Sequence, residues 1–239
     1  MKRSFFCVAL VVLNGCGGSG SDTNSNNSGN STSATACFNA DLNAIGADVT
    51  VVNTRVVNGQ SEPNYTERDV VSGQVTYEGY TNAREVLLYE DSVVNKAYIV
   101  SDESQQQVIT LGQIIDGEEI IYKPNGIQLD YNLRAGETRE YPTVSVLTNG
   151  TQTATYDISF TFEKNETITV PAGEFNTCLM TLTFDVVENG VSTNAVFTQN
   201  IGVSNGLMIR EETNSTAGNS TFTEVNELVS ATINGEIVQ

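Results

Sequence analysis

The segment TYDISFTFEKNETITVPAGEFNTCLMTLTFDVV, residues 155–187, decides the fold class. Bulky apolar side chains occupy every second position from Tyr156 to Phe162 and again from Cys178 to Val186, and most of the positions between them are Thr, Ser or Asp. Because successive side chains of a β-strand point to opposite faces, this period of two gathers the apolar side chains on one face. Each run therefore predicts a strand with one buried face.

The rest of residues 37–239 has the same strand-forming character. It is rich in Val, Ile, Thr, Tyr and Phe, which favour strands. Every second residue from Val71 to Tyr77 is expected to share one face of another strand. Turn-forming dipeptides separate the alternating segments at Asp116-Gly117, Asn149-Gly150, Lys164-Asn165 and Asn189-Gly190. The sequence therefore predicts antiparallel strands joined by short hairpins.

One all-β domain accounts for this pattern. Roughly a dozen strands in about 200 residues favour one large curved antiparallel sheet or a partly open barrel over two separate domains. A two-sheet β-sandwich is the alternative. One short helical turn is expected within residues 38–45, where Phe38, Leu42 and Ile45 would share a face and Gly46 would end it.

The first fifteen residues have the layout of a bacterial export signal. Residues 1–3 supply positive charge, residues 5–13 form an unbroken apolar run, and Leu13-Asn14-Gly15-Cys16 closes it. The run is shorter than the roughly 20 residues that a membrane-spanning helix needs. The tetrapeptide resembles the lipobox of bacterial lipoproteins, which implies cleavage before Cys16 and lipidation of the Cys16 thiol. An ordinary cleaved signal with an incidental Cys is the alternative.

Residues 16–36 are expected to be a flexible tether that begins at the lipidated Cys16. Their composition is almost wholly Gly, Ser, Asn, Thr and Ala, with no large apolar side chain to bury. The expected organisation is a signal peptide at 1–15, the tether at 16–36 and the all-β domain at 37–239. Two or three acyl chains would hold the protein at a membrane almost permanently.

The residue after the lipidated cysteine predicts the membrane. In bacterial lipoproteins an Asp at this position favours retention in the inner membrane, and here the position holds Gly17. The expected location is therefore the outer membrane, at its periplasmic face or at the cell surface.

The four cysteines have separate expected fates. Cys7 leaves with the signal, Cys16 takes the lipid, and Cys37 and Cys178 remain as a single pair. In an oxidising envelope this pair is expected to form a disulfide, which the chain-entropy model credits with roughly 4 to 5 kcal/mol for so long a loop. Because Cys178 shares its face with Met180, the bond is expected on the core side. Two free buried thiols are the alternative.

The net charge of the chain argues against nucleic acid as a partner. The chain carries 29 acidic and 11 basic side chains, for a formal net charge of −18. Binding to nucleic acid rests on clusters of Lys and Arg, and the sequence has none. Acidic pairs are scattered and lack the Asp/Asn ladder of a calcium loop, so the acidity is interpreted as solubility and no metal site is predicted. The pairs include Glu90-Asp91, Glu118-Glu119 and Glu211-Glu212.

The sequence also lacks the residues of common catalytic sites. It contains no His, which removes Ser-His-Asp and Cys-His mechanisms and imidazole ligands for zinc or haem. Only Lys96, Lys123 and Lys164 follow the signal, and none lies in a Ser-x-x-Lys arrangement. No P-loop or dinucleotide motif occurs in the domain. We therefore expect no enzyme activity and no cofactor.

Three short blocks in the second half resemble, in order, those of an uncharacterised family of bacterial β-sheet envelope lipoproteins. Residues 129–138 resemble its entry with Gly-x-Thr, residues 169–175 its V-P-A-G-x-F block, and residues 201–210 its late G-V-G-x-V-K block. The opening Cys37-Phe38-Asn39 resembles its first folded residues. The resemblance implies a fold only, because the family has no agreed activity.

The residues of these blocks suit structural roles. Pro171-Ala172-Gly173 is expected to form a turn that returns Phe175 to the core, because Pro fixes its own φ and Gly allows a positive φ. Gly202 and Gly206 suit bends or bulges.

Three functional hypotheses follow. The first is a non-enzymatic, lipid-anchored envelope lipoprotein whose curved sheet binds an apolar ligand or a protein partner; this rests on fold-level analogy. The alternative is a structural or adhesive cell-surface module displayed on the tether. A glycan hydrolase that uses two carboxylates ranks last, because nothing in the sequence selects one pair among 29 acids.

Overall fold

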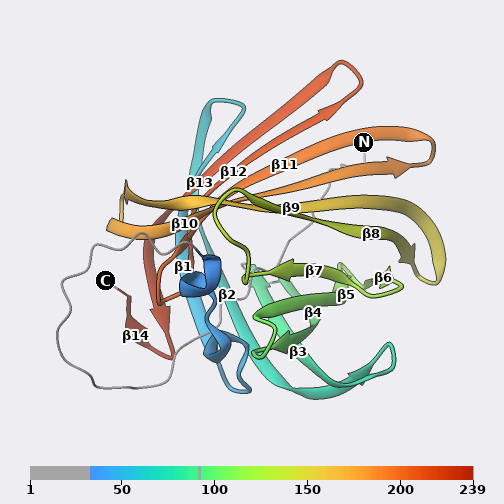
Figure 1. Cartoon of the computed structure of the whole chain (residues 1–239), viewed down its shortest axis with the longest axis horizontal. Helices are drawn as coiled ribbons and strands as arrows, with labels where there is room; N and C mark the ends of the chain where they lie inside the picture. The colour runs from blue at the N-terminus through green and yellow to red at the C-terminus, as the bar shows by residue number, and fades with distance from the viewer. Residues whose placement is uncertain (1–32, 91–92, 239) are drawn as a thin grey trace.

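The computed structural model describes residues 33–90 and 93–238, which form fourteen β-strands and two short 3-10 helices (Figure 1). The predicted signal peptide, Cys16 and most of the predicted tether lie outside the described residues. The helices and strands, in chain order, are η1 (Ala34–Cys37), η2 (Ala40–Asn43), β1 (Asp48–Val57), β2 (Gln60–Tyr77), β3 (Tyr80–Glu90), β4 (Val93–Asp102), β5 (Gln107–Ile115), β6 (Glu118–Lys123), β7 (Ile127–Asp130), β8 (Glu137–Thr148), β9 (Thr151–Val170), β10 (Gly173–Glu188), β11 (Val191–Gly202), β12 (Met208–Ala217), β13 (Ser220–Ile233) and β14 (Glu236–Ile237). The predicted all-β class is confirmed.

Twelve of these strands close into a single antiparallel barrel. Each strand pairs with its neighbour in the order β1 to β6 and then β8 to β13, and β13 pairs back onto β1, with Val51 opposite Ala231. The short β7 pairs with the start of β5, and β14 pairs with the end of β13. The prediction of one large curved antiparallel sheet is confirmed. The barrel is closed rather than partly open, and it is not a two-sheet sandwich.

The core follows the alternation that the sequence predicted. Phe160 lies opposite Leu182, and Ile158 lies opposite Phe184, on one face of β9 and β10. These side chains are at most 3% exposed, whereas Thr161 and Thr181 on the other face retain contact with solvent. Burial of such large apolar side chains is the main favourable contribution to the stability of this part of the barrel.

The predicted turn at Lys164-Asn165 is wrong, because β9 runs through these residues to Val170. The register between β9 and β10 shifts between Leu179 and Met180, so that one extra residue of β9, Glu163, is accommodated as a β-bulge. The β-branched residues that follow continue the strand. The chain reverses at Pro171-Ala172 instead, as the sequence predicted for this second site.

A bulge also makes the predicted shared face of Val71 and Tyr77 wrong. The register of β2 with β3 shifts between Val71 and Gly73. Val71 therefore packs with inward-facing residues of β3 and β4, whereas Val75 and Tyr77 belong to a different apolar cluster on the opposite face of the sheet. One extra residue, Ser72, is enough to exchange the two faces of a strand.

This outer apolar cluster lies under the tip of the β2–β3 hairpin, which curls around the outside of the barrel (Figure 1). The Tyr77 ring stacks on Tyr98 of β4 with a centroid distance of 3.9 Å. The Tyr77 hydroxyl donates to Glu119 of β6, and Lys123 pairs with Glu78 at the tip. The hairpin thus adds a small second layer to one part of the wall.

The short helical turn predicted within residues 38–45 is present as the 3-10 turn η2, and a second 3-10 turn, η1, precedes it. Asn39 separates them with an extended backbone, and its side chain donates to the Asn205 carbonyl at 2.6 Å. Leu42 is buried as expected, but Ile45 is 59% exposed. Within the described residues, no helix has the length and apolar character to cross a membrane.

Residues 33–36, which were predicted to belong to the tether, pack against the barrel. Ser33 forms a β-bridge with Arg134, and the Ala34 amide donates to the Leu133 carbonyl. Ala34 has no exposed surface. The small side chains that favoured a tether also fit this narrow space, so composition did not predict that residues 33–36 pack against the barrel.

Candidate functional site

The predicted pair of cysteines is joined. Cys37 at the end of η1 and Cys178 in β10 form a disulfide with a Cα–Cα distance of 6.2 Å. Both cysteines are almost fully buried, and they pack in the largest apolar cluster with Phe162 and Met180. The prediction of a disulfide on the core side is confirmed. It ties the entering chain to β10 of the barrel wall.

The blocks that resemble the lipoprotein family gather where the chain enters the barrel. In the block at residues 201–210, the Ser204 amide donates to the Ala36 carbonyl of the entering chain, and the Val203 amide donates to the carbonyl of Asn176, the residue after the block at 169–175. The block at residues 129–138 contacts the entering chain through Leu133, whose carbonyl accepts a hydrogen bond from the Ala34 amide. Gly206 has a φ of 67°, which supports the predicted bend. The blocks thus serve to fix the N-terminal segment and the turns around it.

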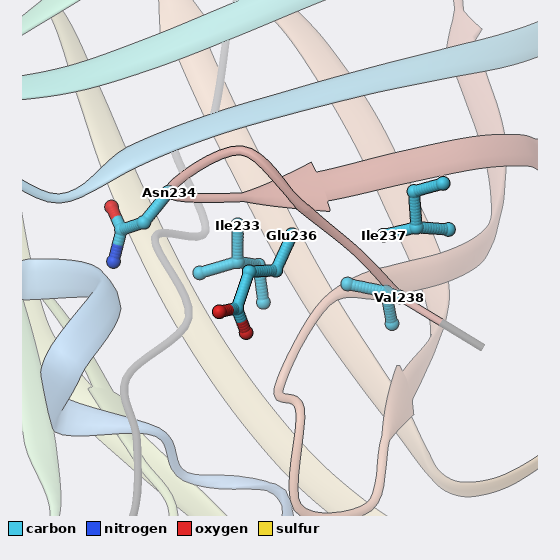
Figure 2. A pocket seen from close by; sticks show the side chains of 5 residues that line it. All are labelled: Ile233, Asn234, Glu236, Ile237 and Val238. Atoms are coloured by element: carbon cyan, nitrogen blue, oxygen red, sulfur yellow. The ribbon is translucent and has the colours of Figure 1, made fainter.

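Two shallow hollows lie on either side of Val238. One, of about 400 Å³, is lined by the end of β13 and by β14 (Figure 2), and the other, of about 300 Å³, lies beside Phe175 and Asn205. In Figure 2 the carboxylate of Glu236 and the side chain of Asn234 point away from Ile237. Neither hollow gathers convergent polar groups of the kind that position a substrate.

A different group of side chains shares the inward face of strands β1, β2, β3, β12 and β13. The register places Glu67 opposite Val51 and Glu90, Asp69 opposite Val49, and Glu211 opposite Asn226. Since Val49 packs in an inner apolar cluster, these positions face the interior of the barrel. We call this group the inward carboxylate cluster; it consists of Glu67, Asp69, Glu90, Glu211 and Glu224, together with Arg55 and Tyr65.

Arg55 is the cation of the cluster. Its Nη2 atom donates to Glu224 at 3.0 Å, and its guanidinium lies 5.7 Å from the centre of the Tyr65 ring. Gln199 of β11 donates to Glu211 at 2.7 Å. Glu67 and Glu90 remain exposed to solvent although they face inward. Solvent therefore reaches this side of the interior.

The protein around the cluster favours the protonated carboxylic acids. Glu67 keeps part of its surface in solvent, but the protein packed around its carboxylate desolvates that group in part. This raises the pKa of Glu67 to about 7, and the charges of Glu90 and Glu211 add to the shift. Desolvation, with a contribution from Glu67, raises the pKa of Asp69 to about 8. The pKa of Glu211 is also raised by burial, against the effect of the hydrogen bond from Gln199. Perturbed pKa values of this kind mark a functional candidate or a structural network.

Sequence reasoning missed the cluster because its members are far apart in the chain. Glu90 and Glu211 each belong to an acidic pair that was interpreted as a solubility feature, but the closure of the barrel brings them to one side. One feature of the local sequence pointed to the cluster: Glu67 and Asp69 occupy every second position before Val71, so they share the inward face of β2 with it. Acids at core-facing positions of a strand are unusual and are worth noting.

Another buried acid has a structural explanation. Asp130 of β7 is 3% exposed and accepts hydrogen bonds from Gln107 at 2.7 Å and from the Tyr141 hydroxyl at 2.9 Å. Arg139 pairs with it at 3.1 Å. These contacts hold β7 against β8. Across residues 33–90 and 93–238, no group of three or more His, Cys, Asp or Glu side chains is arranged to hold a metal ion.

Comparisons with known proteins return two solved structures. A predicted lipoprotein from Parabacteroides distasonis is 13% identical, with a TM-score of 0.42 over 80% of this chain and 96% of the other. A predicted exported protein with a YmcC-like fold from Bacteroides fragilis is 15% identical, with a TM-score of 0.41 over 82% of this chain and 96% of the other. No family model matches the sequence, and no curated relative matches it. Similarity at this level assigns no function.

Proposed function

We propose that the protein is a bacterial envelope lipoprotein, anchored through lipid on Cys16, that acts without catalysis by binding a protein partner. We choose a protein partner over an apolar ligand because packed side chains fill much of the barrel interior. Phe160, Phe162 and Leu182 are at most 1% exposed and, with the disulfide-tied N-terminal segment, fill one side. On the other side, carboxylates lie beside the buried apolar clusters around Val49 and Val71. Because the described interior is occupied by packed side chains and by charged groups, a protein partner on the outer surface is favoured over a lipid-like ligand inside.

The disulfide supports the proposed envelope location. Disulfides form and persist in oxidising compartments such as the periplasm and the cell surface. The Cys37–Cys178 bond is consistent with export by the signal at residues 1–15. Whether the protein resides in the outer membrane, as Gly17 predicts, is part of the proposal.

The hairpins offer the partner-binding surface. The β1–β2, β10–β11 and β12–β13 hairpins extend away from η1 and η2, where the tether enters (Figure 1). At the tip of the β10–β11 hairpin, Val187 is 46% exposed and Val191 is 58% exposed. An anchor at the opposite end would present these tips away from the membrane. A structural or adhesive role would use the same surface.

The anchor is tested by metabolic labelling with a radioactive fatty acid. We expect the wild-type chain to be labelled and to fractionate with outer membranes, because acylation of Cys16 holds it there. A Cys16→Ala variant is expected to lose the label. The matched control is Cys7→Ala, which changes a cysteine within the discarded signal and is expected to keep the label. Labelling that survives Cys16→Ala would contradict the proposal.

A further inference from the structure

The barrel closes at the seam between β1 and β13, and the inward carboxylate cluster straddles this seam. The Arg55–Glu224 ion pair joins the two strands directly. Glu211 lies on β12 beside β13, and Glu67 lies on β2 beside β1. The closing pair of strands therefore has carboxylates on both of its sides.

The charges at the seam do not balance when all the carboxylates are ionised. Arg55 of β1 offsets one of the charges of Glu224 on β13, Glu67 and Asp69 on β2, Glu90 on β3 and Glu211 on β12. Glu62 on β2 lies opposite Arg55 and adds one more carboxylate to this face. The Tyr65 hydroxyl on β2, whose pKa is raised by burial, and the amide of Gln199 on β11 also face the cluster and carry no charge near pH 7. Like charges at close range in a partly desolvated space repel.

We propose that the β1–β13 seam is a pH-responsive latch, in which protonation of Glu67, Asp69 and Glu211 in mild acid tightens the closed barrel and their ionisation loosens it. Repulsion among the carboxylates opposes the approach of β12, β13, β1 and β2. Protonation of Glu67, Asp69 and Glu211 reduces this repulsion, and the Arg55–Glu224 ion pair joins β1 to β13. The seam is the one place where strands from the two ends of the domain must hold together.

The shifted pKa values give the pH window. Glu67 and Asp69 have raised values of about 7 and about 8, so the folded protein binds more protons than the unfolded chain between about pH 4 and pH 8. Stability therefore falls as the pH rises through this window. Hydrogen bonds from Arg68 and Lys96 lower the pKa values of Asp48 and Glu85. The stability that these two carboxylates contribute is therefore lost as the pH falls below the acidic end of the window. Maximal stability is expected at mildly acidic pH.

The test is thermal unfolding of the detergent-solubilised full mature chain at pH 5.5 and pH 8.0. We expect the wild-type Tm to be higher at pH 5.5 by at least about 3 °C. Glu67→Gln should raise the Tm at pH 8.0 and reduce the difference between the two values. Glu211→Gln makes the same change from another strand, which keeps the test valid if one variant fails to fold. The control is Glu163→Gln, an exposed acid of β9 that lies outside the cluster.

Hydrogen exchange locates the effect. After correction for the intrinsic pH dependence of exchange, amides of β1 and β13 should be less protected at pH 8.0 than at pH 5.5, with little change in β9 and β10. A wild-type Tm that is unchanged or higher at pH 8.0 would overturn the proposal. So would an undiminished pH difference in both Glu67→Gln and Glu211→Gln, or a loss of protection spread evenly over the barrel.

Discussion

Cys37 and Cys178 carry the strongest single constraint on the chain. Their bond closes a loop with a sequence separation of 141 residues and sits in the core. Replacing both residues with Ala is expected to lower the free energy of unfolding by about 2 to 5 kcal/mol, mainly because the unfolded chain gains freedom. Urea unfolding measures this change. A reductant should destabilise the wild type and leave the double variant unaffected; an unchanged urea midpoint in the double variant would contradict the prediction.

At the residue scale, the sequence predicted the disulfide pair, which follows from counting cysteines. It did not predict the inward carboxylate cluster, which forms only when the barrel closes. Elimination left Cys37 and Cys178 as one pair, and the structure joins them. The gathering of Glu67 with Glu211 could not be predicted in this way, because it depends on β13 pairing back to β1. Nothing in the local sequence around Glu67 or Glu211 indicates that the two residues lie on the same side of the barrel.

At the scale of elements, the β2–β3 hairpin depends on a close approach to Gly112 of β5. A Cβ atom at this position would lie 2.6 Å from the Ile120 carbonyl oxygen and 2.6 Å from the Tyr77 hydroxyl. Gly112→Ala is therefore expected to destabilise the protein by about 1 to 3 kcal/mol, since backbone must move to relieve the overlap.

Chemical denaturation measures the effect of Gly112→Ala. The matched control is Gly73→Ala in β2, where an added Cβ would meet open space and the φ is not positive. Equal stability changes in the two variants would show that the hairpin does not press on β5 in solution.

Bulges explain where strand predictions failed. The alternation from Tyr156 to Phe162 gave the correct faces because its register with β10 is unbroken over those residues. The faces of β2 were wrong because Ser72 is an extra residue relative to β3. A bulge leaves little trace in composition, since the residue that is left unpaired needs no special side chain. Turn predictions at Asn149-Gly150 and Asn189-Gly190 held because Asn and Gly tolerate the positive φ that both turns adopt.

At the scale of the whole molecule, the chain forms one closed barrel that uses its interior for packing and for a charged seam. The all-β class and the single large sheet followed from periodicity and spacing. Closure did not, because the pairing of the first and last long strands is the contact with the largest sequence separation, and local patterns carry no information about it. The assignment of a lipid anchor remains a prediction from residues 1–16.

Native mass spectrometry of the detergent-extracted full chain is the most direct test of two claims: that Cys16 carries covalent lipid, and that the barrel interior is packed with side chains rather than with a ligand. We expect a mature chain that begins at Cys16, carries covalent diacylglycerol with or without an N-acyl chain, contains one disulfide and loses no further mass on denaturation. A chain without covalent lipid would contradict the anchor. A lipid that dissociates only when the protein unfolds would contradict the packed interior and return the carrier of an apolar ligand to first place.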